Sequence, residues 1–488
     1  MKILIVGCGM VGELLADILH ESGHEVWGVT HGEASAQRLT ASKPWKVAAC
    51  DISREDQVAD LAQRIGRLDG WVHCASSGRG GAEAYEAVYF RGQEHLLRHF
   101  PAAHPVFAAS TSVYDQTDGS WVDEQTKAEP QRATGQWLRR AEDLALQAGG
   151  CAIRLGGLYG PGRSHLLKNF LLGQGGLEVT PEAPDGRYLN ILHVHDAAQA
   201  LAHGLKARLR GLYNAVDGTP VTQRECLQRL GVIFGVEIPA EIPANAGRKR
   251  GWSHKRVSCA KLLASGWQPR YPSYWDAIEH DPELVSSILA EVQQESPTPP
   301  RRSTVLLIGL MGCGKTTVGR LVARLLGFHF IDTDAQIIKR AGRSIPEIFA
   351  QEGEAGFRRH ESAVLRSLLG SSGVVVATGG GIVTEAVNLP LLRHLGFITW
   401  LEASVQRLVE RTRGNDDRPL LQGQVSLEQR LSSLLEVRSG LYAQLADLRL
   451  VTDGLDPQES AYGIAESARH FFAQRGSLGS RPPQSSAP

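Results

Sequence analysis

The chain has 488 residues, more than one ordinary folding unit, which predicts two domains. Its 42% hydrophobic and 21% charged residues are typical of a protein with sizeable cores, and its formal net charge of zero argues against a nucleic-acid or membrane partner. Seven scattered cysteines without CxxC spacing argue against a disulfide framework or a zinc site. No export signal and no apolar run of about 20 residues is visible, so we expect a cytoplasmic protein. The oligomeric state is left open.

Both halves of the chain open on an apolar strand, a glycine loop and an amphipathic helix. The strands are expected at residues 2–6 and 304–308, and the apolar residues after each loop recur at helical spacing. Alternating strands and helices predict an α/β protein, with a Rossmann-type doubly wound parallel sheet first and a second parallel sheet after it. Ligands of such sheets bind at the carboxyl ends of the strands, where both glycine loops lie.

Composition places the domain boundaries. Pro297, Pro299 and Pro300 deny helix and favour an extended spacer. We therefore predict an NAD(P)-binding domain over residues 1–285, a proline-rich linker over 286–302, a kinase domain over 303–475 and a disordered tail over 476–488.

Residues 309–316 read GLMGCGKT and match the P-loop pattern GxxxxGK[ST] between an expected strand and helix. The glycines let backbone N–H groups surround phosphate oxygens, and the helix N-terminus adds partial positive charge. Lys315 supplies a full charge, and Thr316 offers a hydroxyl for Mg²⁺. The loop predicts an ATP site and leaves the phosphoryl acceptor unspecified.

Four later features bear on the acceptor. In FIDTD, Asp332 is expected to hold Mg²⁺ through water, and Asp334 to orient an acceptor hydroxyl, with a helix N-cap as its alternative. Arg358 and Glu361 are three residues apart and share one helical face. Either Arg358 binds a substrate carboxylate and Glu361 orients it, or the two form a surface salt pair. Residues 374–381 read VVVATGGG, a buried strand ending where only bare backbone lets a ligand approach. Arginines flank the polar loop 414–417, which is expected to act as a lid.

These motifs, GLMGCGKTTVGR, DTD, GFRRHE, GGG, RPLL and RSGLY, make residues 303–475 resemble the shikimate kinases. The resemblance implies a five-stranded parallel sheet with a mobile lid, and transfer of the ATP γ-phosphoryl to the 3-hydroxyl of shikimate with Mg²⁺, in aromatic amino-acid biosynthesis. A gluconate-type or nucleotide kinase, or a nucleotide-binding regulator, is the alternative.

The resemblance also implies roles for individual residues of this chain. Lys315, Asp334 and Arg418 would be catalytic, and Thr316 and Asp332 would hold the metal. ATP would contact Gly312, Cys313, Gly314, Lys315, Thr316, Thr317, Arg411 and Arg418. Shikimate would contact Asp334, Arg358, Gly379, Gly380, Gly381 and Arg438.

In the N-terminal half, Gly7, Gly9 and Gly12 form GxGxxG between a strand and a helix, which predicts a dinucleotide site. The acidic residue expected about 20 positions on, to hold the ribose of NAD, is not evident, because residues 26–32 read VWGVTHG. The choice between NAD and NADP is therefore open. Arg38 is a candidate partner for a 2′-phosphate, or an exposed helix charge.

Segments including CDIS, ASTSVYD, IRLGGLYGPGR and LNILHVHDAAQA resemble the NAD(P)-dependent epimerase/dehydratase family. The resemblance implies Asp51 near adenine and Ser110 at the reacting carbonyl or hydroxyl. The family's YxxxK pair is replaced by Thr134 and Leu138, and no spacing rule supports Tyr114 as a substitute. An active reductase or epimerase, a nucleotide-binding module without chemistry, and a fold that stabilises the kinase are the three hypotheses.

Overall fold

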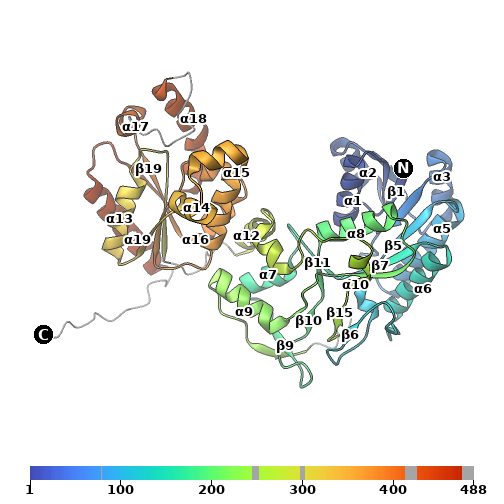
Figure 1. The fold of residues 1–488 in the computed structure, drawn as a ribbon. Coiled ribbons are helices and arrows are strands. Elements are labelled where there is room, and N and C mark those ends of the chain that lie inside the picture. Colours follow the sequence, from blue (N-terminus) through green and yellow to red (C-terminus); the bar gives the residue numbers. More distant parts are fainter. Residues whose placement is uncertain (79, 245–251, 297–302, 413–425, 475–488) are drawn as a thin grey trace. The chain divides into compact units, whose positions relative to one another are not determined.

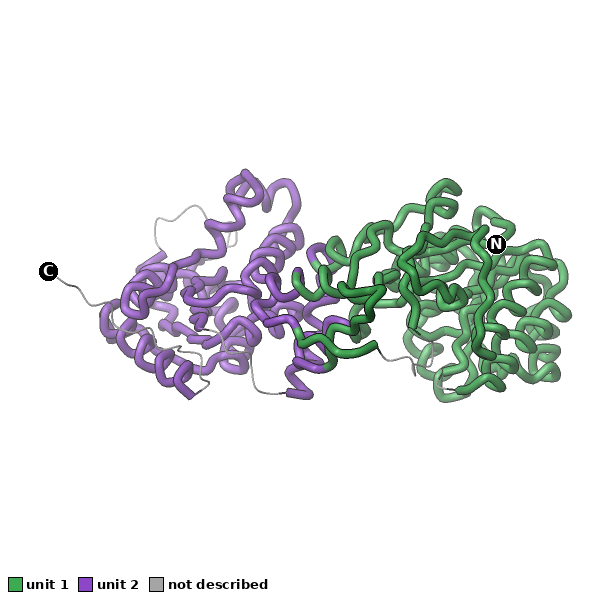
Figure 2. The backbone as a smooth tube through the Cα atoms, turned by 90° about the horizontal axis from the view of Figure 1, so that it is seen from below, with its two compact units in different colours: residues 1–165, 175–228, 239–278 green, residues 166–174, 229–238, 279–488 purple. Residues whose placement is uncertain are grey.

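The computed structural model describes residues 1–78, 80–244, 252–296, 303–412 and 426–474. The chain forms two compact units (Figure 2). The N-terminal unit comprises residues 1–165, 175–228 and 239–278, and the C-terminal unit comprises residues 166–174, 229–238 and 279–488. No helix in the described part of the chain is long and apolar enough to cross a membrane.

A seven-stranded parallel sheet forms the centre of the N-terminal unit, in the order β12-β7-β5-β4-β1-β2-β3. Its strands are β1 (Lys2–Val6), β2 (Glu25–Thr30), β3 (Lys46–Ala49), β4 (Gly70–His73), β5 (His104–Ser110), β7 (Cys151–Leu155) and β12 (Gly211–Ala215). The order reverses at β1, as expected for a doubly wound sheet, and the predicted Rossmann-type fold is confirmed.

Both faces of this sheet are covered, because side chains alternate along each strand. Ile3 and Ile5 of β1 join the core formed with α1 and α8, whereas Leu4 and Val6 join the core formed with α3 and α5. The helices of this unit are α1 (Met10–Glu21), α2 (Glu33–Ser42), α3 (Glu55–Ile65), α4 (Ala82–Tyr85), α5 (Gly92–His99), α6 (Ala133–Gln147), α8 (Val194–Lys206), α10 (Ala260–Ala264) and α11 (Tyr274–His280). Figure 1 labels all of them except α4 and α11. The π-helical turn η1 (Glu86–Arg91) links α4 to α5.

Beyond the main sheet, four two-stranded pairs support the later loops of the unit. They are β8 (Gly157–Tyr159) with β11 (Ile191–His193), β10 (Tyr188–Leu189) with β13 (Val221–Thr222), β9 (Leu177–Val179) with β14 (Glu241–Pro243), and β6 (Trp121–Val122) with β15 (Arg256–Val257). Strand β15 pairs with β6, and Lys255, just before β15, lines one cavity together with Ser110 at the end of β5.

The C-terminal unit contains a five-stranded parallel sheet in the order β17-β18-β16-β19-β20, which confirms the predicted strand number and direction. The strands are β16 (Thr304–Ile308), β17 (His329–Asp332), β18 (Val374–Ala377), β19 (Phe397–Glu402) and β20 (Leu448–Val451). Around it lie α13 (Lys315–Leu326), α14 (Thr333–Ala341), α15 (Ile345–Ser367), α16 (Asn388–Leu395), α17 (Val405–Thr412), α18 (Leu427–Leu445) and α19 (Pro457–Gln474) (Figure 1). Strand β16 is fully buried, as its continuous apolar run requires.

Three helical segments from earlier in the chain belong to the C-terminal unit: α7 (His165–Leu171), the last turns of α9 (Gln223–Phe234) and α12 (Leu284–Glu295). Helix α12 packs on α16, and Gln293 Nε2 donates to the Pro390 carbonyl at 3.0 Å. The first part of the predicted linker is therefore helical, because its prolines begin only at Pro297. Residues 297–302, the predicted tail and the lid loop 414–417 lie outside the described residues, and the boundaries stay predictions.

Candidate active site

The P-loop connects β16 to α13 through backbone that other residues rarely adopt. Gly309, Gly312 and Gly314 all have positive φ, at 136°, 83° and 96°. A Cβ at Gly309 would lie 2.3 Å from the Leu401 carbonyl oxygen, and one at Gly312 would lie 2.8 Å from Thr412 Cγ2. The loop is thus pressed against β19 and α17, and only glycine allows this approach.

The lysine and threonine that end the motif lie at the N-terminus of α13. Lys315 Nζ donates to the carbonyls of Gly309 at 2.7 Å and Leu310 at 2.8 Å, so the ammonium lies across its own loop. Thr316 Oγ1 donates to Asp332 Oδ2 at 2.9 Å. A hydroxyl and a carboxylate side by side are the oxygen ligands that Mg²⁺ prefers, so these two residues fit the predicted metal site.

Asp332 also resolves the alternative for Asp334. Its Oδ1 accepts from the Asp334 and Ala335 amides at 3.0 and 3.4 Å, so Asp332 is the N-cap of α14. The Asp334 carboxylate points to the glycine triplet instead. A Cβ at Gly379 would lie 3.2 Å from Asp334 Oδ1 and 2.4 Å from Glu361 Oε1. Two carboxylates thus converge on one bare stretch of backbone.

Glu361 is fully buried in this cluster, and burial raises the pKa of its carboxyl to about 7. The Arg358 guanidinium lowers that pKa in opposition, and the negative charge of Asp334 raises it further. Arg358 Nη1 donates to Glu361 Oε2 at 2.5 Å, and Nη2 donates to Glu354 Oε1 at 2.7 Å. The spacing of three residues therefore makes a buried pair, because Arg358 is only 6% exposed.

Gly381 is where the guanidinium of Arg358 crosses the triplet. A Cβ at Gly381 would lie 2.2 Å from Arg358 Nη1 and 2.4 Å from Nη2. The third glycine is therefore a condition for the position of Arg358. That relation could not be read from the sequence, where the two residues belong to separate motifs.

Helix α18 supplies a second buried arginine. Arg438 is 4% exposed, and its Nη1 makes no hydrogen bond with any described residue. One turn on, the Tyr442 hydroxyl donates to the Gly380 carbonyl at 2.5 Å, which ties α18 to the triplet. Burial raises the pKa of Tyr442, whereas Arg438 and Arg358 lower it. Sequence reasoning missed Tyr442, although it lies in the quoted RSGLY.

Two predicted nucleotide residues remain. Arg411 lies near the end of α17, beside the P-loop, with Nη1 3.5 Å from Thr452 Oγ1 and Nη2 3.5 Å from the Thr452 carbonyl. This location suits contact with a bound nucleotide. Arg418 lies outside the described residues. Thr317 follows Thr316 in the first turn of α13, and Cys313 is buried in the loop.

The N-terminal unit carries a cavity of about 460 Å³ at the carboxyl ends of its strands, lined by Gly7, Gly9, Gly12 and Ser110 among others. A Cβ at Gly7, with φ of 97°, would lie 2.3 Å from Ala75 Cα, and one at Gly12 would lie 2.2 Å from the Gly7 carbonyl oxygen. A Cβ at Gly9 would meet nothing within 4 Å. These glycines form the cradle that a pyrophosphate requires, so the residues fit a dinucleotide.

At the ribose end, Thr30, His31, Ser35 and Arg38 line the cavity and no carboxylate does among the described residues. Asp51 is not part of this lining. Its Oδ1 accepts from the Ser53 amide at 3.0 Å and hydroxyl at 2.7 Å. The Arg38 side chain is 59% exposed, with Nη2 3.5 Å from Glu13 Oε2.

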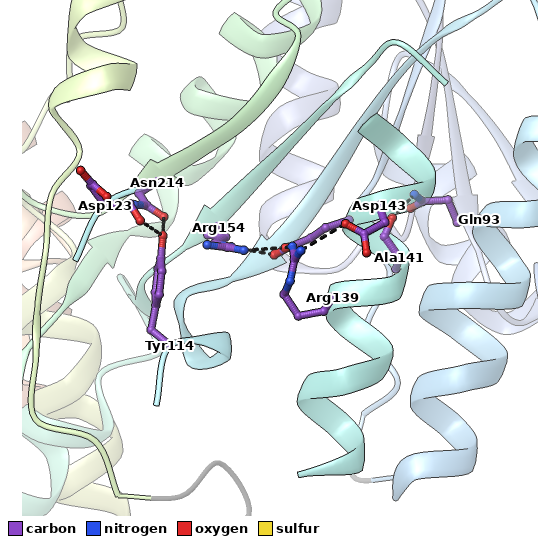
Figure 3. A network of polar contacts seen from close by, with 9 residues as sticks. Gln93, Tyr114, Asp123, Arg139, Ala141, Asp143, Arg154 and Asn214 are labelled. Atoms are coloured by element: carbon purple, nitrogen blue, oxygen red, sulfur yellow. Dashed lines mark hydrogen bonds and ion pairs between the residues drawn. The ribbon is translucent and has the colours of Figure 1, made fainter. Parts of the chain in front are cut away.

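At the other end of the cavity, Leu138 lines the wall where the family carries lysine, and Thr134 does not line it. Tyr114 does not line it either. Its ring is fully buried, and its hydroxyl lies 2.7 Å from the Asp123 carbonyl oxygen and 3.1 Å from Asn214 Oδ1 (Figure 3). Arg154 lies 4.6 Å above that ring and binds Glu142 through two hydrogen bonds of 2.9 and 2.8 Å. Tyr114 is therefore a core residue.

The P-loop has three glycines with positive φ, a lysine, and a threonine beside an aspartate, and a cluster of buried arginine and carboxylate side chains lies at residues 379–381. These features define a P-loop phosphotransferase. The shikimate kinase family model matches residues 311–469, and the model of the NAD dependent epimerase/dehydratase family matches residues 3–215. A shikimate kinase of Methylococcus capsulatus is 51% identical over 146 residues, which are 30% of this chain and 81% of that protein. One of Halorhodospira halophila is 49% identical over 165 residues, 34% of this chain and 93% of that protein.

Through its C-terminal part the chain belongs to the shikimate kinase family, and it is an ATP-dependent kinase. The crystal structure of a UDP-glucose-4-epimerase from Stenotrophomonas maltophila, with bound NAD and formylated UDP-arabinopyranose, is 18% identical, with a TM-score of 0.50. The likeness covers 61% of this chain and 99% of the epimerase chain. This likeness supports the Rossmann-type fold of the N-terminal unit and nothing beyond the fold.

Proposed function

We propose that the C-terminal unit transfers the γ-phosphoryl group of ATP to the 3-hydroxyl of shikimate. The observation that carries this is a buried cluster of charged groups. Arg358, Asp334 and Glu361 meet the glycine triplet, and Arg438 lies one turn before Tyr442, which binds Gly380, and acts electrostatically on Glu361. Shikimate has one carboxylate and three hydroxyls, so the arginines match the first and the carboxylates match the others. The shikimate kinases among its relatives support the same acceptor.

In this proposal each group has a defined task. Residues 312–317 and Arg411 hold ATP, and Lys315 with Arg418 stabilises the transferring phosphoryl group. Thr316 and Asp332 hold Mg²⁺, which neutralises charge on the phosphate oxygens when bound. Arg358 and Arg438 bind the carboxylate, and residues 379–381 give the ring a bare surface. Asp334 accepts a hydrogen bond from the attacking hydroxyl and orients it.

The test is release of ADP in a coupled assay with the full chain, ATP, Mg²⁺ and shikimate, against gluconate and nucleoside monophosphates. Turnover that depends on shikimate alone supports the proposal, and Lys315→Ala should abolish it because no other cation replaces the ammonium in the loop. Turnover with gluconate or a nucleotide in place of shikimate would reassign the acceptor. Retained activity of Lys315→Ala would refute the role of that lysine.

For the N-terminal unit we propose a module that binds NAD or NADP without the family's chemistry. The observation that favours binding is the glycine cradle, and the one that disfavours turnover is Leu138 in the wall. The test is dinucleotide fluorescence, followed by consumption assays with carbonyl substrates. Net oxidation or reduction of the dinucleotide would establish an active reductase. An epimerase regenerates its bound dinucleotide, so transient reduction of bound NAD by a sugar substrate, followed by isomerised product, would establish that alternative. We expect a cytoplasmic location for the whole protein.

A further inference from the structure

A second, smaller cavity adjoins the dinucleotide cavity of the N-terminal unit. Its volume is about 160 Å³, room for a small functional group and a few waters, and it shares Ser110, Ser112 and Gly156 with the larger cavity. Arg187 and Lys255 also line it. The two cavities are therefore neighbours that share a wall at the end of β5, so a ligand beside Ser110 in the first lies next to the residues that line the second.

Lys255 is buried in this wall, with 4% of its surface exposed. Its Nζ donates to the Tyr114 carbonyl at 2.7 Å and to Ser253 Oγ at 2.8 Å. No carboxylate of the described residues forms an ion pair with it. Burying a cation without a counter-charge is costly, and a methionine of similar length would avoid the cost. A lysine at this buried position therefore favours an anionic ligand as its counter-charge.

Asn190 holds the backbone at Lys255 in place. Asn190 Nδ2 donates to the Lys255 carbonyl at 2.9 Å, and Asn190 Oδ1 accepts from the Val257 amide at 2.8 Å. Burial lowers the pKa of Lys255 to about 8, the more distant Asp115 raises it and Arg187 lowers it. Because Arg187 lowers the pKa of Lys255 and lines the same smaller cavity, two cationic side chains lie at that cavity.

Hydroxyls lie at the junction of the two cavities. Ser110 Oγ accepts from the Ser112 amide at 3.2 Å, which leaves its proton to donate to a ligand. We propose that Lys255 and Arg187 form an anion-binding subsite, which receives the carboxylate or phosphate group of a small molecule whose remainder lies beside Ser110 in the larger cavity. The inference is independent of the kinase and of whether this unit performs chemistry.

The experiment uses the full chain with its kinase site filled beforehand by ADP, Mg²⁺ and shikimate, because P-loops and arginine pairs also bind anions. Inorganic phosphate and acetate are the probes, acetamide is the neutral control, and calorimetry gives the affinities. The variants are Lys255→Met and Arg187→Met. Lys261→Met is the matched control, since Lys261 also donates to a carbonyl, of Leu212 at 2.7 Å, but does not line the cavity.

We expect the wild type to bind phosphate or acetate and not acetamide, and each cavity variant to bind at least about 10-fold more weakly, from the loss of a hydrogen bond to a charged group. Lys261→Met should bind as the wild type does. If phosphate binds more tightly than acetate, the anionic group of the ligand is a phosphate, and if acetate binds more tightly, it is a carboxylate. Unchanged affinity in Lys255→Met, or no anion binding by the wild type, overturns the proposal. Should Lys255→Met fail to fold, Arg187→Met decides by the same comparison.

Discussion

Replacing Gly381 by alanine tests whether the glycine triplet positions Arg358 for a substrate carboxylate. The backbone of Gly381, with φ of −97° and ψ of 0°, is open to alanine, so the change adds only a methyl group. That methyl carbon would lie 2.2, 2.4 and 2.5 Å from Nη1, Nη2 and Cζ of Arg358. The guanidinium must then move by about 1 Å to reach van der Waals distance.

Such a shift is costly here because Arg358 is not a loose side chain. It is 6% exposed, and both Glu361 and Glu354 hold its two terminal nitrogens. The misaligned fork loses at least one charge-assisted bond to substrate, about 1.5–3 kcal/mol. This corresponds to an increase in the KM for shikimate of about 10- to 150-fold. The KM for ATP should stay the same, since the P-loop is untouched.

Steady-state kinetics with shikimate and ATP varied in turn measures both constants. Gly440→Ala is the matched control, because it makes the same change on α18, two residues from Arg438, where a Cβ meets nothing within 4 Å. Its KM values should not change. If Gly381→Ala kept a KM for shikimate within about twofold of the wild type, the argument that Arg358 binds the carboxylate from this position would be refuted.

Two further predictions concern the N-terminal unit. Burial raises the pKa of Asp217 from 3.8 to about 8, so the folded state holds an extra proton between these values and the wild type loses stability as pH rises through them. The Asp217→Asn variant lacks this pH dependence. Between pH 5 and 8 its free energy of unfolding, measured with urea, should rise relative to that of the wild type by up to about 1.4 kcal/mol per pH unit. If the two free energies changed in parallel with pH, Asp217 would not be neutral in the folded state. Gly9→Ala should leave the melting temperature unchanged, because its Cβ meets no protein atom, and should lower dinucleotide affinity by filling the cradle. Unchanged binding would place the pyrophosphate elsewhere.

Features encoded by neighbouring residues could be predicted from the sequence of the kinase half. The P-loop, the strand before it and the Arg358–Glu361 pair each depend on spacing within one element. The contacts of Gly379 with Glu361, of Gly381 with Arg358 and of Tyr442 with Gly380 join segments far apart in the chain. Only the packing of α15 and α18 against the end of β18 brings them together.

In the N-terminal half, the burial of Lys255 could not be predicted for the same reason, because it depends on contacts between distant segments. A buried lysine and a solvated one look alike in sequence, and Lys255 is brought to Ser110 and Ser112 only by β15, which pairs with β6. The resemblance also predicted Asp51 near adenine. One oxygen of its carboxylate accepts from Ser53 and lies 3.7 Å from Nδ1 of His31, which lines the cavity. Its role at adenine stays a prediction.

The three glycines of GxGxxG have different physical reasons, and the difference bears on what the motif can establish. At Gly7 and Gly12 a side chain would strike the protein itself, at Ala75 and at the Gly7 carbonyl, so these two are required for β1, β4 and α1 to pack. Gly9 alone would direct a side chain into open space along the cavity wall. Two of the three positions would persist in a unit that had lost its ligand, because the fold needs them. The evidence for function therefore rests on Gly9, where a side chain would meet no protein atom, and on the buried charge of Lys255, which forms no ion pair with a described residue.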